Sequence, residues 1–322
     1  MKSFTAGEND AGQRADKFLS KAVPLLPKNL MYRYIRQKRI KINGRRCEIS
    51  QKIEVGDVID LYINDEFFES KSDRPFLRAP AQTEIIYEDE NILIANKKSG
   101  LAVHADESGD CDTLIDRIQH YLYNKGEYDP DGELSFAPAL CNRIDRNTTG
   151  LVICAKNAES LRILDQKIKD REVKKSYLCV SVGIPTPCEG TITTHLEKDE
   201  KTKTVRVTKQ KTPRSRTAVT KYKVLAQSGG LALCEVQLVT GRTHQIRVHM
   251  AHIGCPLLGD GKYGKNELNR KYGVKTQALQ SHKLVFDFRT DSGILEYLGG
   301  REFCAPKPWF ADKFFKNTEV IL

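Results

Sequence analysis

The sequence lacks the features of membrane-spanning, secreted and zinc-binding proteins. Its longest apolar runs are far too short to span a bilayer. The N-terminal stretch MKSFTAGENDAGQR has no apolar core of the kind that a signal peptide carries. Nine cysteines are scattered along 322 residues without a C-x-x-C pair, which favours buried thiols over disulfides or a zinc site. We therefore expect a cytoplasmic protein with no membrane segment.

Acidic residues are outnumbered, and this imbalance is the clearest compositional signal. There are 52 Lys and Arg against 42 Asp and Glu, a net charge of +10. A basic balance of this size indicates a polyanionic partner, most often nucleic acid. Hydrophobic residues make up 39% of the chain and charged residues 29%, as in ordinary globular proteins, and the length favours two domains.

Basic residues concentrate first in KNLMYRYIRQKRIKINGRR, residues 28–46, which holds eight Lys or Arg and no acid. We predict a helix over 29–37, a strand over 39–42 and a hairpin turn at Asn43-Gly44. The following IEVGDVIDLYI is interpreted as a strand hairpin around Gly56-Asp57. Residues 1–63 hold 13 basic and 7 acidic side chains, a net charge of +6. The candidate RNA-binding residues of this segment are Arg33, Arg36, Lys38, Arg39, Arg45 and Arg46.

The segment 1–63 resembles the small αL RNA-binding domain first known from a small-subunit ribosomal protein. The matching stretches are RADKFL, IRQKRIKINGRR and VGDVIDLYI. Residues 64–82, NDEFFESKSDRPFLRAPAQ, have the polar, Pro-containing composition of a linker. A second, larger domain is then expected over 83–322.

Strand-like and helix-like segments alternate irregularly in this larger domain. We predict strands at EIIY, ILIAN, LVICA and SYLCVSVG, and helices over 113–124 and 160–173. Because no regular βαβ period is present, we expect an α+β fold with a mixed, largely antiparallel sheet and flanking helices. Residues 198–217 hold eight basic and two acidic side chains and are predicted to form an exposed basic hairpin or loop, a second surface for a polyanion.

A carboxylate between two arginines stands out in NRIDRNTTGL, residues 142–151. Asp145 is flanked by Arg143 and Arg146 and followed by an Asn-Thr-Thr-Gly turn. One interpretation is a turn residue with incidental basic neighbours, since short polar side chains bond the local backbone. The other is a reactive carboxylate kept ionised by an arginine. This stretch alone does not choose between them.

The densest group of functional side chains is GRTHQIRVHMAHIGCPLLGDGKYG, residues 241–264. A helix is predicted over 243–253, ended by a Gly and a Pro. Its three histidines are spaced by five and three residues without an H-E-x-x-H pattern, so we predict no metal site. Arg242 and Arg247 lie in the same stretch, and an arginine buried there would need a charged partner.

Together, NRIDRNTTGL, KKSYLCVSVG and GRTHQIRVHMAHIGCPLLGDGKYG are similar to the motifs of the RluA family of pseudouridine synthases, in the family's order. The resemblance extends over about 84–310 and includes LQSHKLVFDF and CAPKPWF. Two positions depart from the family pattern. Asn142 stands where many relatives have His, and Lys98 stands where the family often has Pro.

The resemblance implies a role for several residues. Asp145 would be the carboxylate that acts on the target uridine, Tyr177 would pack on the uracil ring and take the C5 proton, and Arg247 would pair with the carboxylate. Arg143 would fill the gap left by the displaced base. Arg146, Arg242 and His244 are further candidates for RNA contact. The resemblance implies no metal, nucleotide or redox cofactor.

The expected activity is isomerisation of specific uridines by a monomer, with large-subunit (23S) ribosomal RNA as the expected substrate. Attack of the carboxylate at C1′ of the sugar and attack at C6 of uracil both stay open. Transfer RNA is the alternative substrate, and an RNA-binding assembly factor without catalysis is the alternative function. Both functions explain the charge, but only catalysis explains the set Asp145, Tyr177 and Arg247.

Overall fold

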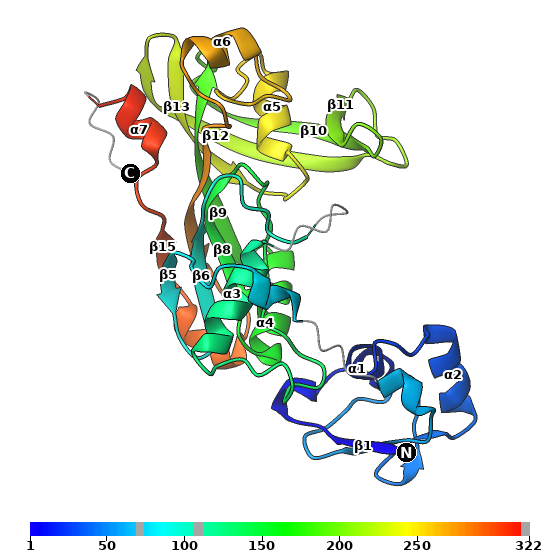
Figure 1. Cartoon of the computed structure of the whole chain (residues 1–322). Helices are drawn as coiled ribbons and strands as arrows, with labels where there is room; N and C mark the ends of the chain where they lie inside the picture. Colours follow the sequence, from blue (N-terminus) through cyan, green and yellow to red (C-terminus); the bar gives the residue numbers. More distant parts are fainter. Residues whose placement is uncertain (69–73, 106–111, 317–322) are drawn as a thin grey trace.

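The computed structural model describes residues 1–68, 74–105 and 112–316, so the expected linker over 64–82 lies partly outside the described residues. The N-terminal domain and the large sheet domain form two separate bodies (Figure 1). Within the described ranges, none of the helices has both the length and the apolar character needed to cross a membrane.

The N-terminal domain packs two helices on a four-stranded sheet of order β1-β4-β2-β3. Asn43 and Gly44 both take positive φ, 52° and 72°, as the tight turn between β2 and β3 requires. The hairpin predicted around Gly56-Asp57 is wrong. Gly56 forms a turn, and β4 instead pairs with β2 and with the N-terminal strand β1, which the sequence pattern did not predict. The elements are β1 Lys2–Thr5, α1 Ala15–Ala22, α2 Lys28–Arg36, β2 Ile40–Ile42, β3 Arg45–Arg46 and β4 Val58–Leu61.

The large domain is built on one long sheet of order β11-β10-β12-β13-β9-β14-β8-β6-β5, with β15 paired to β14 and β7 to β8. Among the described strands, the β14–β8 pairing is parallel and every other pairing is antiparallel. This confirms the predicted mixed, largely antiparallel sheet. The strands are β5 Ile85–Glu88, β6 Ile92–Lys97, β7 Ala139–Leu140, β8 Thr149–Ala155, β9 Val173–Val182, β10 Glu189–Asp199, β11 Thr204–Thr208, β12 Arg216–Ser228, β13 Leu231–Leu238, β14 Leu279–Phe286 and β15 Glu302–Cys304.

Five α-helices accompany this sheet in the described part of the domain. Figure 1 shows α3 and α4 beside β6 and β8, whereas α5 and α6 lie at the opposite end, near β10 to β13. The predicted helix 160–173 begins earlier, at Ala158, because the Asn157 side chain accepts a hydrogen bond from Ser160 N at 2.8 Å and caps the first turn. The helices are α3 Leu114–Asn124, α4 Ala158–Lys169, α5 Gln245–His252, α6 Asn266–Lys271 and α7 Trp309–Phe314.

Polar contacts join the N-terminal domain to the large domain. Ser135 Oγ donates to the buried carboxylate of Asp10 at 2.5 Å and accepts from Gln13 Nε2 at 2.6 Å. The first amide of α4, on Ala158, donates to Asn9 Oδ1 at 2.9 Å. These bonds satisfy groups that the contact removes from water. They join the N-terminal domain, which carries the basic helix α2, to the large domain.

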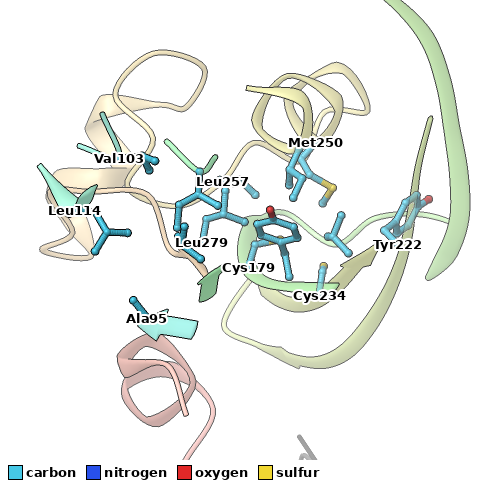
Figure 2. Close-up of a cluster of buried hydrophobic side chains, with 14 of the residues drawn as sticks. Ala95, Val103, Leu114, Cys179, Tyr222, Cys234, Met250, Leu257 and Leu279 are labelled. Atoms are coloured by element: carbon cyan, nitrogen blue, oxygen red, sulfur yellow. The ribbon is translucent and has the colours of Figure 1, made fainter. Parts of the chain in front are cut away.

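One buried hydrophobic cluster of the large domain is formed by side chains of β8, β9 and β13 and extends to α5. Figure 2 shows Cys179 and Cys234 next to each other, with Met250 and Leu257 above them and Ala95 and Leu114 farther along. Cys179 and Cys234 are directly opposite on β9 and β13. All eight cysteines of the described residues are free thiols.

Gly150, at the start of β8, permits the parallel contact with β14. It takes a φ of +105°, and a Cβ there would lie 2.1 Å from the carbonyl oxygen of Ser281. Any other residue would therefore push the two strands apart. The Gly of the NTTGL stretch thus serves strand packing, and it places the preceding loop at the junction of β8, β14 and β9.

Candidate active site

Asp145 lies in the loop that enters β8, where its backbone closes a turn and its side chain pairs with an arginine. Its backbone carbonyl accepts from Thr148 N at 3.0 Å and closes a turn. Its side chain, 26% exposed, meets Arg247, whose Nη1 donates to Asp145 Oδ2 at 2.8 Å. The carboxylate is therefore fixed by a charged partner 102 positions downstream.

Arg247 lies on α5 with its side chain 7% exposed. Its Nε and Nη2 donate to the two oxygens of Asp260, at 2.7 and 2.9 Å. Asp260 is fully buried and also accepts from the amides of Lys262 and Tyr263. The planar guanidinium thus binds one carboxylate with two donors and presents a third to Asp145, a geometry that lysine could not reproduce.

The charges of this triad stabilise one another although water is largely excluded. Burial disfavours the charged guanidinium, but the hydrogen bonds and charges of Asp260 and Asp145 outweigh it and raise the pKa of Arg247 above its ordinary value. Burial likewise opposes ionisation of Asp260, yet Arg247 and the two amides lower its pKa. Arg247 and Asp260 are therefore both charged, and the Arg247 guanidinium also faces the Asp145 carboxylate.

Tyr177 lies on β9, opposite Ser281 of β14, and is 5% exposed. Burial raises the pKa of its phenol to about 12, and the negative charge of Asp145 adds to this effect. The ring is therefore a neutral phenol at physiological pH. The structure brings Tyr177 within electrostatic reach of the Asp145–Arg247 pair.

The other candidate residues divide between this site and the N-terminal domain. Arg143 and Arg146 are exposed and flank Asp145, and Arg242 is exposed and donates to Thr217 O at 3.2 Å. His244 is mostly buried, with Nε2 3.8 Å from Asp145 Oδ2. The N-terminal candidates lie on and after α2, in the other body of Figure 1. Arg33, Arg36, Lys38, Arg45 and Arg46 are exposed, and half-buried Arg39 lies over the Tyr34 ring at 4.6 Å.

The side chains of His244, His249 and Asn142 form hydrogen bonds within the protein. Helix α5 begins at Gln245, two residues later than predicted, because His244 takes a positive φ. His249 is buried between Thr220 and Thr194, with 2.8 Å to each hydroxyl, and burial lowers its pKa to about 4. Asn142 bonds the backbone of β8, accepting from Ile153 N at 2.8 Å. No group of three potential metal ligands is found in the described ranges.

The sequence patterns missed two charged residues of the site, Asp260 and Lys97. Asp260 stands in the GDGKYG stretch, and the need of a buried arginine for a partner was the signal that could have found it. Lys97 precedes the Lys98 departure and is 1% exposed. Its position at the end of the apolar run ILIAN was the available signal for a buried, hydrogen-bonded lysine.

Lys97 holds the Asp145 loop in place. Its Nζ donates to the carbonyl oxygens of Lys98, Leu101 and Arg146 at 3.0, 2.7 and 2.8 Å. Burial lowers the pKa of Lys97 to about 7, while the Asp145 charge opposes that change. We expect Lys97→Met to reduce the free energy of unfolding by about 1–3 kcal/mol, because buried carbonyls lose their donor. Urea unfolding measures this, and an unchanged midpoint would contradict it.

The chain matches the family model described as RNA pseudouridylate synthase over residues 91–252 and the S4 domain model over 13–59. It is 34% identical to ribosomal large subunit pseudouridine synthase C of Rickettsia conorii, over 79% of this chain and 83% of the relative. It is 30% identical to ribosomal large subunit pseudouridine synthase D of Borreliella burgdorferi, over 100% of this chain and 95% of the relative.

Solved structures with the same fold include two human proteins. Human RNA pseudouridylate synthase domain containing 4 superposes with a TM-score of 0.55 at 23% identity, over 71% of this chain and 90% of that one. Human RNA pseudouridylate synthase domain containing 1 superposes with a TM-score of 0.57 at 20% identity, over 76% of this chain and 91% of that one. The family models and the sequence relatives confirm the resemblance found in the motifs, and the solved structures show the same fold: the chain belongs to the RNA pseudouridylate synthase family and carries an N-terminal S4 domain.

Proposed function

We propose that this chain isomerises uridines of large-subunit ribosomal RNA to pseudouridine, with Asp145 as the reacting carboxylate. The observation that carries the assignment is the Asp145–Arg247–Asp260 triad, in which a partly exposed acid is paired to a buried arginine that a second, fully buried acid anchors. Such a network orients the first acid and places a positive charge beside it. It leaves Asp145 as the member of the triad with substantial access to a substrate.

The chemistry requires a carboxylate of this kind. The N1–C1′ bond of uridine breaks, the uracil turns and a C5–C1′ bond forms. The C5 proton leaves and N1 gains a proton, so atoms balance without a co-reactant. An ionised carboxylate can add covalently or stabilise positive charge at the sugar, as carboxylates do in glycoside chemistry. Because bases are stacked in RNA, the target nucleotide must first be extruded, which is easiest in single-stranded or loop regions.

Tyr177 and the exposed arginines supply the remaining functions in this proposal. The neutral Tyr177 ring offers an apolar face to the flipped uracil and a hydroxyl near the carboxylate. Arg143, beside Asp145, occupies the place of the displaced base, while Arg146 and Arg242 contact phosphates. The relatives named as ribosomal large-subunit synthases support a ribosomal target, and a ribosomal target favours the cytoplasm as the site of action.

The test of the substrate is a map of pseudouridines in ribosomal and transfer RNA from cells with and without this protein. We expect one or a few large-subunit positions to lose the modification. Loss confined to transfer RNA would overturn the ribosomal assignment. Unchanged maps in both RNAs, together with no activity of the purified protein on ribosomal RNA transcripts, would overturn the proposed activity.

RNA binding by the N-terminal domain should depend on the exposed arginines of α2 and β3. Replacing Arg33, Arg36, Arg45 and Arg46 by Gln removes four charges, all from exposed side chains. For every phosphate that the variant no longer neutralises, the slope of log K against log salt should become shallower by about 0.7–0.9. The measurement is RNA affinity titrated over a range of salt concentrations.

Two exposed lysines outside this surface, Lys169 and Lys174, provide the control. Lys174 pairs at the surface with Asp287 at 2.8 Å, and such pairs contribute little to stability. Their Gln variants should keep the salt slope of the original chain. Equal slopes for the arginine variant and the unmodified protein would contradict a role of the N-terminal domain in RNA binding.

A further inference from the structure

His244 approaches the same carboxylate oxygen as Arg247. Its Nε2 lies 3.8 Å from Asp145 Oδ2, the atom that Arg247 Nη1 contacts at 2.8 Å. Its φ of +53° is an uncommon conformation for a residue with a side chain, so the surrounding structure has to fix it. The other ring nitrogen, Nδ1, has a hydrogen-bond partner.

The second ring nitrogen, Nδ1, lies 2.7 Å from the hydroxyl oxygen of Tyr263. That oxygen already accepts a hydrogen bond from the backbone amide of Val205 on β11, at 2.8 Å. A phenol has one proton to donate. When it donates to Nδ1, that nitrogen is an acceptor, and the neutral ring carries its proton on Nε2.

The opposite tautomer is disfavoured on both sides of the ring. A proton on Nδ1 would turn the lone pair of Nε2 toward the negative Asp145 Oδ2 and would leave the Tyr263 proton without this acceptor. Burial raises the pKa of Tyr263 and lowers the pKa of His244, although the Asp145 charge opposes the second change. A protonated phenol and a neutral imidazole are therefore the expected states near neutral pH.

We propose that His244 is a positioning residue, which Tyr263 holds as the Nε2–H tautomer. His244 and Arg247 together fix Oδ2 of Asp145 and leave Oδ1 as the reacting oxygen. This inference rests on the proposed role of Asp145. At 3.8 Å the His244–Asp145 separation is longer than a hydrogen bond, and such contacts often tighten when the substrate is bound. Positioning of Asp145 is a different role for His244 from the RNA contact expected from the sequence.

Tyr263 links the Asp145 carboxylate to the basic hairpin formed by β10 and β11. Tyr263 packs against the buried cluster of Leu196, Val205, Ala218 and Val248. Lys262 Nζ donates to Lys203 O at 3.1 Å, beside the hairpin turn. Tyr263 also lies against Arg247, whose guanidinium carbon is 5.1 Å from the ring centroid. One tyrosine thus connects the hairpin to both groups that hold Asp145.

The tautomer can be measured directly in the intact protein by nitrogen NMR of ¹⁵N-histidine-labelled samples, with the His244 signals assigned from a His244→Gln sample. We expect a pyridine-like Nδ1 and a pyrrole-like Nε2. In Tyr263→Phe, the Nδ1 signal should shift because its donor is removed. A pyrrole-like Nδ1 in the unmodified protein, whether from the other tautomer or from the charged ring, would overturn the inference.

Kinetics give the second readout. Tyr263→Phe and His244→Leu should each lower kcat about tenfold to hundredfold, with KM for RNA nearly unchanged, because misplacement of a reacting group affects the chemical step. His244→Gln, which retains an N–H donor, should recover part of the loss. Tyr222→Phe is the matched control, since it also removes a tyrosine hydroxyl bonded to backbone, at 3.1 Å from Pro187 O.

The outcome for Asp145 itself separates this inference from the proposed function. If Asp145→Asn is inactive while His244→Leu and Tyr263→Phe keep the original kcat, the positioning role fails and the catalytic role of Asp145 stands. If Asp145→Asn is active, the assignment of the reacting carboxylate fails and the positioning role fails with it.

Discussion

Replacement of Asp145 by Asn is expected to reduce uridine isomerisation by about 10³-fold or more, the scale of loss when an essential reacting group is removed. Asn is neutral, so it can neither add to the sugar or base nor stabilise developing positive charge. It can still accept a hydrogen bond from Arg247, which keeps its bidentate contact with Asp260. Affinity for RNA should stay within about threefold, since phosphate contacts dominate binding.

The measurement is single-turnover conversion of a ribosomal RNA transcript, with RNA affinity determined in parallel. Asp287→Asn is a suitable control, because Asp287 also pairs with a cation at 2.8 Å and is 40% exposed, but belongs to a surface pair with Lys174. This control should retain the original rate. A similar rate for Asp145→Asn and the unmodified protein would remove Asp145 from the mechanism.

Much of the fold follows from local patterns, and the exceptions have physical causes. The strands at EIIY and ILIAN were predicted correctly because alternation and turn residues are local signals. The hairpin of β10 and β11 is one of the two forms expected for residues 198–217. Strand β1 was missed because its short sequence acquires its structure only by pairing with β4 across more than fifty residues. Sheet order, including the parallel β14–β8 contact, depends on such distant pairings and has no local signal.

The site was predictable in part. The Asp145–Arg247 pair expected from the family resemblance is present in the structure. By contrast, Asp260 and Tyr263 stand within a glycine-rich stretch that predicts no role for them, because their function arises from what α5 and β11 bring next to them. A local pattern shows that a residue can form a turn. It does not show which buried group that turn will face.

Arg247→Met is expected to have the second largest effect, on stability and on activity together. The substitution leaves the fully buried Asp260 carboxylate with two backbone amides as its remaining donors among the described residues. Removal of one partner of a buried ion pair costs about 3–5 kcal/mol of the free energy of unfolding. Asp145 loses the donor that fixes Oδ2, so isomerisation should fall as well.

A double variant separates the two effects. In Arg247→Met with Asp260→Asn, the buried negative charge is removed, and part of the unfolding free energy should return, on the order of 0.5–3 kcal/mol for residues in direct contact. The rate should stay low, because Asp145 still lacks the hydrogen bond that the Arg247 guanidinium donates to its Oδ2. Urea unfolding and single-turnover rates on the same samples measure both quantities. Recovery of the rate along with stability would show that Arg247 acts only through the fold, and the pairing of Asp145 with a cation would lose its place in the mechanism.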